Sequence, residues 1–224
     1  MQQGQTAILF LSRSLNDEYN AKGKGFSKRF FKSFYQFLIT GTLNTLNQSD
    51  LPVFQSYSNQ QIGNSFGERL THELKRIQAQ GFASVIIVGN DSPELKLDDI
   101  SIAEEELLKR KSVLGKNQRG GTYLIAFRFD QTDLNQIEDV DWHTGRVAEQ
   151  LNAILFSPTI LKTKIDLNSQ LDILNLLKSG LITGGVKAFF SLLLQPSFGS
   201  FKFKQKSRRY LLSNSFRRGP PFIA

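Results

Sequence analysis

The stretch Ser84-Val85-Ile86-Ile87-Val88-Gly89-Asn90-Asp91-Ser92 decides the fold. Its first five residues, 84–88, are rich in β-branched side chains and too uniformly apolar for a strand with one face in water. The run therefore predicts a central strand that is buried on both faces. Gly89 permits a sharp exit from this strand, so we expect the polar residues after it at the carboxyl edge of a sheet.

Around this strand, short apolar runs alternate with longer segments of helical periodicity. The expected elements are strands at 7–11, 52–57, 84–88, 112–115 and 122–129, and helices at 30–46, 66–80 and 98–111. This order is typical of a mainly parallel sheet that is covered by helices. The sequence accordingly predicts an α/β fold, and 224 residues suit one principal core.

The composition limits the chemistry that the chain can perform. Hydrophobic residues make up 40% and charged residues 21%, which is ordinary for a globular protein. The absence of cysteine excludes disulfides, thiolate metal sites and a cysteine nucleophile. His72 and His143 are the only histidines and lie far apart in the sequence. Carboxylates must therefore bind any metal.

The chain shows no targeting or membrane segment. Residues 1–11 lack the basic start, long apolar middle and cleavage site of a signal peptide. The most apolar later stretch, 181–194, contains Gly184, Gly185 and Lys187, and it is shorter than the ~20 residues that span a bilayer. We expect a cytoplasmic protein without a transmembrane segment.

The net charge of +8 is concentrated in two clusters. The first is Lys22, Lys24, Lys28, Arg29 and Lys32; the second is Lys202, Lys204, Lys206, Arg208, Arg209, Arg217 and Arg218. The first cluster lies beside Gly23 and Gly25, near the end of the first expected strand. Phosphate binding and a solvated helix face are both open interpretations of it.

Asp91 is the candidate metal ligand. It follows the central strand directly, and hard oxygen ligands suit Mg²⁺ or Mn²⁺, which often use one or two carboxylates plus substrate phosphates. The competing interpretation is that Asp91 and Ser92 cap the following turn. From spacing alone, capping is favoured.

Four segments occur in a characteristic order: Gly67–Leu70 (GERL), Val88–Leu95 (VGNDSPEL), Leu114–Ile125 (LGKNQRGGTYLI) and Trp142–Val147 (WHTGRV). They resemble a bacterial glycosyltransferase A-like family called domain of unknown function 2064, whose typical forms are G-E-R-L, I-G-S-D-S-P-x-L, L-G-P-x-x-D-G-G-Y-Y-L-I and W-x-T-x-x-V. The resemblance is strongest over residues 66–151 and weaker over residues 7–46.

The resemblance implies a three-layer α/β/α fold with a mainly parallel mixed sheet, of the nucleotide-diphospho-sugar transferase (GT-A) type. It implies that Asp91 binds the Mg²⁺ or Mn²⁺ that bridges nucleotide phosphates, with Asp166, in a segment similar to the family's D-x-D, as a second acidic ligand. An ordinary surface carboxylate at a helix start is an equal alternative for Asp166. Gly120 and Gly121 would admit a nucleotide or nucleotide-sugar close to the backbone; a simple turn is the alternative. For Trp142, stacking on a base or sugar ring and half-buried packing are both open, and packing is favoured.

Two departures from the family pattern favour a degraded site. Arg119 stands where the family usually has an aspartate, and a guanidinium cannot ligate Mg²⁺, although it can bind phosphate. A P-G-x-x-K-T-R-L segment after the first strand is also missing. Lys22, Lys24 and Arg29 are the candidates to replace its charge.

The predicted organisation has three parts. Residues 1–166 form the transferase-like domain, 167–195 an apolar helical extension that packs on it, and 196–224 a basic aromatic tail. Aromatic residues interleaved with lysine and arginine suit RNA, an anionic membrane surface or an acidic protein, and we leave these partners open.

Two functions follow. The first is transfer of a glycosyl or nucleotidyl group with a divalent metal. The alternative is a catalytically degraded member that acts as a nucleotide-binding or protein-interaction module through its basic tail.

Overall fold

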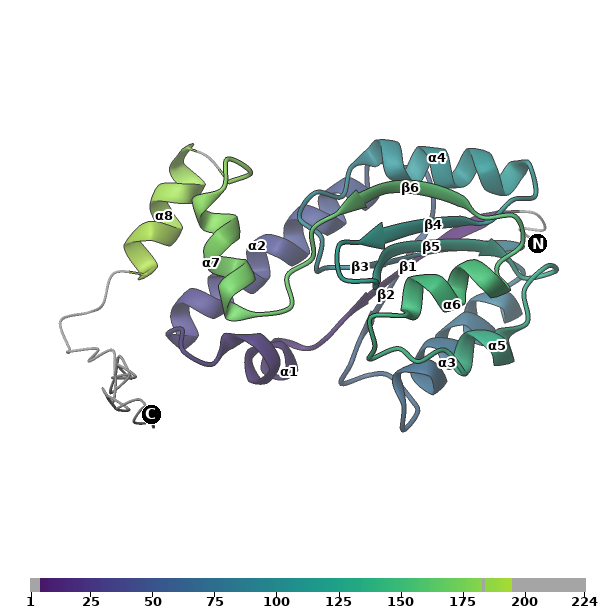
Figure 1. Ribbon diagram of the computed structural model, residues 1–224, viewed down its shortest axis with the longest axis horizontal. Coiled ribbons are helices and arrows are strands. Elements are labelled where there is room, and N and C mark those ends of the chain that lie inside the picture. Colours follow the sequence, from purple (N-terminus) through teal and green to yellow (C-terminus); the bar gives the residue numbers. More distant parts are fainter. Residues whose placement is uncertain (1–4, 183, 195–224) are drawn as a thin grey trace, which may run out of the picture. The chain divides into compact units, whose positions relative to one another are not determined.

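A computed structural model describes residues 5–182 and 184–194 (Figure 1). The predicted tail, 196–224, lies outside the described residues. The elements are β1 Thr6–Ser12, α1 Leu15–Glu18, the π-helix η1 Tyr19–Gly23, α2 Lys28–Leu46, β2 Val53–Tyr57, α3 Phe66–Ala79, β3 Ser84–Gly89, α4 Leu97–Leu108, β4 Val113–Asn117, β5 Thr122–Arg128, α5 Leu134–Glu138, α6 Val147–Ile154, β6 Thr159–Lys164, α7 Gln170–Lys178 and α8 Gly184–Leu194.

The strands form one sheet of six in the order β2-β1-β3-β5-β4-β6. β5 runs antiparallel to both of its neighbours, and the other pairings are parallel. β3 is a central strand, as predicted, because its Ile86 pairs with Ile8 on one side and Ala126 on the other. The mainly parallel mixed sheet is confirmed.

The sheet is covered on both faces, which confirms the three-layer architecture (Figure 1). On β1, Leu9 and Leu11 join the cluster that contains buried residues of α3, α5 and α6. Ile8 and Phe10 point the other way, into a cluster with buried residues of α2 and α4. Alternation along a strand buried at every position produces this split. We call these sides the α3 face and the α2 face.

β6 was not predicted from the sequence. Its residues, Thr-Ile-Leu-Lys-Thr-Lys, bury only Leu161 and Lys164, because the strand lies at the edge of the sheet beside β4. An edge strand needs little apolar sequence, so periodicity does not reveal it. β6 matters for function because its end brings Asp166 to the same edge of the sheet as the end of β3.

A third apolar cluster joins α7 and α8 to the first half of α2 (Figure 1). Phe190 of α8 contacts the rings of Phe30 and Phe34 edge-on, at centroid distances of 5.8 and 5.4 Å. Ile173 of α7 belongs to the same cluster. A division of the chain at residue 166 stays a prediction. Within the described ranges, no helix is long and apolar enough to cross a bilayer.

The start of α3 explains part of the GERL motif. Ser65 caps the helix by accepting from the Glu68 N–H at 3.0 Å, and the Glu68 carboxylate accepts from the Asn64 N–H at 2.8 Å. Gly67 lies against α5, where an added Cβ would stand 2.1 Å from the Glu138 carbonyl oxygen. Gly67 is therefore required for the close approach of α3 and α5.

Gly67→Ala is expected to destabilise the protein by about 1–3 kcal/mol, because the new methyl group meets backbone that has to move. Gly41→Ala is the control, since Gly41 is exposed inside α2 and its Cβ would meet nothing within 4 Å. That variant should gain about 0.5–1 kcal/mol from reduced chain entropy and better helix propensity. Urea unfolding measures both; equal stability of the two variants would contradict the packing role of Gly67.

Candidate functional site

A cleft of about 760 Å³ opens at the carboxyl edge of the parallel strands. Open α/β sheets usually carry their ligands at this edge, because the loops that leave the strands meet there. Its polar and charged lining includes Arg13, Asp17, Glu18, Gln61, Arg69, Asn90, Asp91, Ser92, Asn117, Arg119, His143, Thr144, Asp166 and Asn168. The cleft therefore lies just beyond the end of β3, beside the residues that the sequence analysis singled out.

Asp91 is held by a buried lysine. The Lys22 ammonium lies 2.7 Å from Asp91 Oδ1 and 2.7 Å from Glu18 Oε1, and only 4% of the Lys22 side chain is exposed. Burial opposes the charged lysine, but the Asp91 and Glu18 carboxylates prevail and raise the pKa of Lys22 above its usual value. Lys22 is therefore a permanent cation at neutral pH.

The local chain geometry places Lys22 in this position. Lys22 lies in the single π-helical turn η1, directly after α1, so its side chain reaches back to Glu18 one turn earlier. Gly23 has the ring of Tyr19 at 2.4 Å from where its Cβ would be, so a larger residue would displace this turn. From the sequence, Lys22 was predicted to contact phosphate. In the structure its ammonium instead binds the Asp91 carboxylate.

The capping interpretation of Asp91 does not match the structure. Lys96 is the N-cap residue of α4, and the Asp91 carboxylate accepts from the Lys22 ammonium. Asp91 lines the cleft with 38% of its side chain exposed. Its Oδ2 accepts no hydrogen bond from any residue in the described ranges, which leaves one carboxylate oxygen open to the cleft.

Asp166 lies beside Asp91. The Leu167 N–H donates to the Asp91 carbonyl oxygen at 2.9 Å, which joins the segment after β6 to the exit of β3. Asp166 Oδ2 accepts from the side-chain amides of Asn117 and Asn168. Burial raises the pKa of Asp166, and repulsion from Asp91 adds to the rise. The two carboxylates proposed as metal ligands are thus close enough to repel each other.

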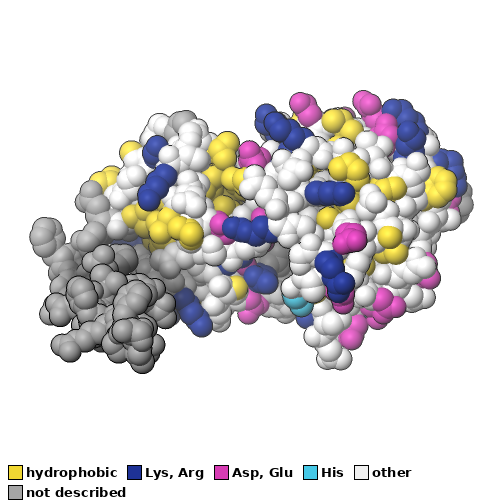
Figure 2. Space-filling view, viewed as in Figure 1, with side chains coloured by type: hydrophobic (Ala, Val, Ile, Leu, Met, Phe, Trp, Pro, Cys, Tyr) yellow, Lys and Arg dark blue, Asp and Glu magenta, His cyan; other side chains and the backbone are white. Residues whose placement is uncertain are grey.

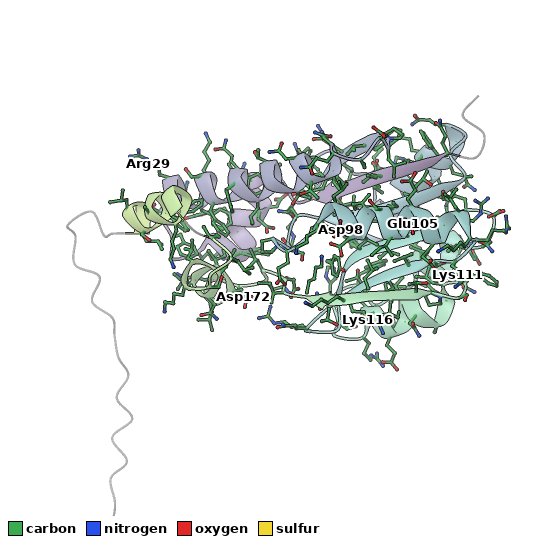
Figure 3. The ribbon with its side chains drawn as sticks, turned by 90° about the horizontal axis from the view of Figure 1, so that it is seen from above. Arg29, Asp98, Glu105, Lys111, Lys116 and Asp172 are labelled. Carbon is green, nitrogen blue, oxygen red and sulfur yellow. The ribbon has the colours of Figure 1, made fainter. Side chains whose placement is uncertain are left out.

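Arg119 is engaged by the helix that follows. Its guanidinium donates to both oxygens of Asp172, at 3.0 and 2.5 Å, and lies 3.6 Å from Asp166 Oδ1. Asp172 lies in the first turn of α7, beside the sheet end that carries Lys116 (Figure 3). Burial raises the pKa of Asp172, yet hydrogen bonds from Arg119 and Ser169 bring it to about 2. Arg119 thus links the β4–β5 turn to α7.

The paired glycines have different surroundings. Gly120 has φ +80°, and an added Cβ would lie 1.8 Å from the Gly145 carbonyl oxygen, so it serves the turn and the packing against residue 145. Gly121 lines the cleft, and its N–H donates to Asn117 Oδ1 at 2.8 Å. Lys24, the remaining predicted contact, is exposed and does not line the cleft.

An aromatic pair forms the wall on the α3 face. The rings of Phe66 and Trp142 meet edge-on at 5.0 Å, and both residues line the cleft. The Trp142 indole N–H donates to the Ile137 carbonyl oxygen at 3.0 Å. Trp142 is half-buried against the core, as the sequence interpretation expected, and its ring also reaches the cleft.

Sequence reasoning missed Glu18, Asn117 and Arg69 as site residues. Glu18 carries a usable signal, because it stands four residues before Lys22, the spacing of a helical ion pair. Arg69 lies within the GERL motif, which was used only for its resemblance. Asn117 carries no signal in the sequence, since only the pairing of β4 with β6 brings it to Asp166.

The side chains of the cleft offer few ligands for a divalent cation. Among the described residues, no group of three or more His, Cys, Asp or Glu side chains is arranged to hold a metal ion. Asp91 and Asp166 each keep one carboxylate oxygen without a hydrogen bond from a described residue. This donor set fits Mg²⁺ or Mn²⁺ that is completed by phosphate and water.

The sheet order and its helical layers form a fold of the nucleotide-diphospho-sugar transferase type. The family described as "Uncharacterized protein conserved in bacteria (DUF2064)" matches residues 36–144, so the resemblance seen in the motifs is confirmed. No curated protein matches the chain.

Solved structures share the fold at low sequence identity. A proposed nucleotide-diphospho-sugar transferase from Desulfovibrio desulfuricans G20 aligns with a TM-score of 0.70 and 17% identity, over 86% of this chain and 97% of that chain. Rv0371c from Mycobacterium tuberculosis H37Rv aligns at 0.53 with 11% identity, over 80% and 100%. Its homologue from Mycobacterium sp. strain JC1 aligns at 0.50 with 9% identity, over 85% and 99%. These similarities establish the architecture.

Lys22→Met is expected to cost about 3–5 kcal/mol, because it leaves two carboxylates around a buried position without their cation. The control is Lys24→Met, which removes the same charge from an exposed side chain. Chemical unfolding of both variants at pH 7 measures the difference. A loss below about 1 kcal/mol for Lys22→Met would show that the pair does not hold the loop.

The deficit of Lys22→Met should shrink as the pH falls. Burial, and then repulsion from Asp91, raise the folded-state pKa of Glu18 above its ordinary value. A carboxyl with a raised folded pKa favours folding below its unfolded pKa and loses that contribution as the pH rises through the folded pKa. Protonated Glu18 needs no ammonium partner, so unfolding of the variant from pH 7 to pH 4 should approach the wild type. A constant deficit would contradict this role of Glu18.

Proposed function

We propose that the protein binds a nucleotide or nucleotide-sugar in the cleft with Mg²⁺ or Mn²⁺ and transfers a glycosyl or nucleotidyl group. The observation that supports this function is the approach of Asp91 and Asp166, which follow two different strands. Asp91 has one oxygen open to the cleft, whereas the second oxygen of Asp166 lies 3.6 Å from Arg119, which a cation would have to displace. The shared fold of the Desulfovibrio protein, itself a proposed nucleotide-diphospho-sugar transferase, agrees with this class.

Asp91 and Asp166 are the residues that would hold the cation. When bound, a divalent cation neutralises charge on the phosphates and on the leaving group. The remaining contributions come from the chain. Lys22 holds Asp91 in place from behind, since its side chain is buried and does not line the cleft. Gly121 lines the cleft, but the space that its Cβ would take is filled by the Asn117 amide at 2.6 Å, so its small size serves Asn117 and not, as the sequence suggested, a ligand. Arg119 offers a half-exposed guanidinium for a phosphate oxygen.

The described part of the chain is almost neutral, so an anionic ligand would be bound by individual cations and not by a broad positive surface potential. Seven of the 28 Lys and Arg side chains, and no acidic ones, fall in residues 195–224, so residues 1–194 carry 21 basic and 20 acidic groups, a net charge of +1. Figure 2 shows both signs interspersed over the body. Anion binding by the body therefore depends on the few cations in the cleft.

A second candidate is a catalytically degraded member of the family that binds a nucleotide or a protein partner. Arg119 favours it, because it replaces the aspartate typical of the family and contacts Asp166 and Asp172 in place of a metal. In this proposal the basic tail, which lies outside the described residues, contacts an acidic protein, RNA or an anionic membrane surface. A cytoplasmic location belongs to both proposals.

Nucleotide binding should depend on the metal and on Asp91. We expect nucleoside triphosphates or nucleotide-sugars to raise the unfolding temperature with Mn²⁺, because a ligand at 100 times its Kd stabilises by about 2.7 kcal/mol. Asp91→Asn and Asp166→Asn should weaken Mn²⁺-supported binding at least tenfold in calorimetry. Asp98→Asn is the control, since Asp98 is exposed on α4 and lies outside the cleft (Figure 3).

The two candidates give different results in this experiment. Binding that needs Mn²⁺ and is lost in Asp91→Asn supports the transferase. Binding of equal strength with and without Mn²⁺, unchanged in Asp91→Asn, favours the degraded member. A complete lack of response to any nucleotide would remove the support for both nucleotide-based proposals.

A further inference from the structure

Arg69 differs from the other arginines of the cleft. Three arginines line it: Arg13, Arg69 and Arg119. Arg13 lies 3.5 Å from Glu18, and Arg119 is bound by Asp172. Within the described ranges, Arg69 has no carboxylate within ion-pairing distance. It is the one cleft arginine there whose charge the chain leaves without a counterion.

The hydrogen bonds of Arg69 are also incomplete. Its Nη1 makes one long bond, 3.5 Å, to the Asn64 carbonyl oxygen, and its buried Nε has no partner among the described residues. The neighbouring Glu68 carboxylate is engaged by the Asn64 N–H. A buried donor without an acceptor costs about 1–3 kcal/mol, and a guanidinium has five donors to satisfy. An anion in the cleft would supply the missing counterion and acceptors for the Nη donors of the guanidinium.

The surroundings of Arg69 add to its positive potential and supply an apolar wall. Arg69 lies in the first turns of α3, where the helix dipole favours negative charge. Phe66 and Trp142 line the same cleft, and the indole N–H of Trp142 is used by Ile137, which fixes the ring. An anionic group at Arg69 would therefore have an aromatic surface beside it for the carbon skeleton of the ligand.

This part of the cleft is distinct from the carboxylate pair. α3 packs on one face of the sheet, whereas η1, which carries Lys22, joins the apolar cluster around α2 on the other side. Among the described residues, Arg69 forms neither a hydrogen bond nor an ion pair with Asp91 or Asp166, and its side chain donates to Asn64. A phosphate held by a metal at those carboxylates would leave Arg69 available to a second molecule.

We propose that Arg69 forms the binding subsite for an acidic group of the acceptor, which is a phosphate or a carboxylate. Phe66 and Trp142 contact the rest of that molecule. This inference rests on the proposed function. The acceptor class is thus a small organic acid or phosphate ester. A neutral sugar or alcohol would leave the guanidinium without its counterion. Arg69 is a binding residue that determines acceptor specificity and takes no part in the chemistry at the metal.

Two small probes with the same skeleton test this subsite on the full-length protein: glycerol 3-phosphate and glycerate. Their Kd values are measured by NMR titration, with and without saturating nucleotide and Mn²⁺. We expect binding in both conditions, a shift of the Arg69 Nε–H resonance, and at least tenfold weaker binding in Arg69→Met. Arg69→Lys should recover part of the affinity, because it keeps the charge without the planar fork. Lys75→Met, which removes an exposed charge from the same helix, should match the wild type.

The outcomes separate this proposal from the proposed function. Binding of only one of the two probes identifies the acid group and supports the subsite. No binding of either probe to the wild type overturns the subsite, as does equal binding by Arg69→Met and the wild type. If Arg69→Met weakens nucleotide binding by the same factor as it weakens probe binding, Arg69 belongs to the nucleotide site and the acceptor role is overturned. Failure of nucleotides to bind, with the probes still bound at Arg69, counts against the transferase alone.

Discussion

The site depends on one buried ammonium. Lys22 lies between Glu18 and Asp91 at 2.7 Å from each and is almost fully withdrawn from water. A charge in that position is stable only when its partners are close, and removal of one partner leaves the others uncompensated. The pair therefore holds the loop after β1 against the loop after β3. It also explains why Asp91 faces the cleft instead of capping the turn that follows it.

Arg119 finds acidic partners within the fold. α7 supplies Asp172, which accepts both guanidinium ends of Arg119, and the apolar cluster of α2, α7 and α8 holds α7 in place. Arg119 and α7 are thus joined by an ion pair. Arg119 remains half-exposed at the cleft, so the same residue ties the extension to the site and stays available to an anion.

Charge in the cleft is arranged in two parts. The carboxylates of Asp91 and Asp166 lie with Lys22 and Arg119 around them, and this group suits a metal with phosphates. On the α3 face, Arg69 lies with an aromatic pair and has no counterion among the described residues. The two groups of charges belong to elements that pack on opposite faces of one sheet.

Much of the fold was determined by the sequence itself. The apolar run 84–88 required burial on both faces, and the alternation of short and long periodic segments predicted the mainly parallel sheet, because periodicity reports which side of each element is buried. Asp91 was predicted at the carboxyl edge for the same reason. β6 was missed, because an edge strand that exposes Ile160, Lys162 and Thr163 and buries Lys164 has no apolar pattern.

Only the tertiary structure decided how the site is assembled. Lys22 was proposed to contact phosphate, yet it is buried against Asp91, 69 residues away in sequence. Asn117 reaches Asp166 across 49 residues, and Arg119 reaches Asp172 across 53. Ion pairs and hydrogen bonds act over a few ångströms and carry no periodic signal along the chain, so their partners are known only when the strands have been placed in order and register.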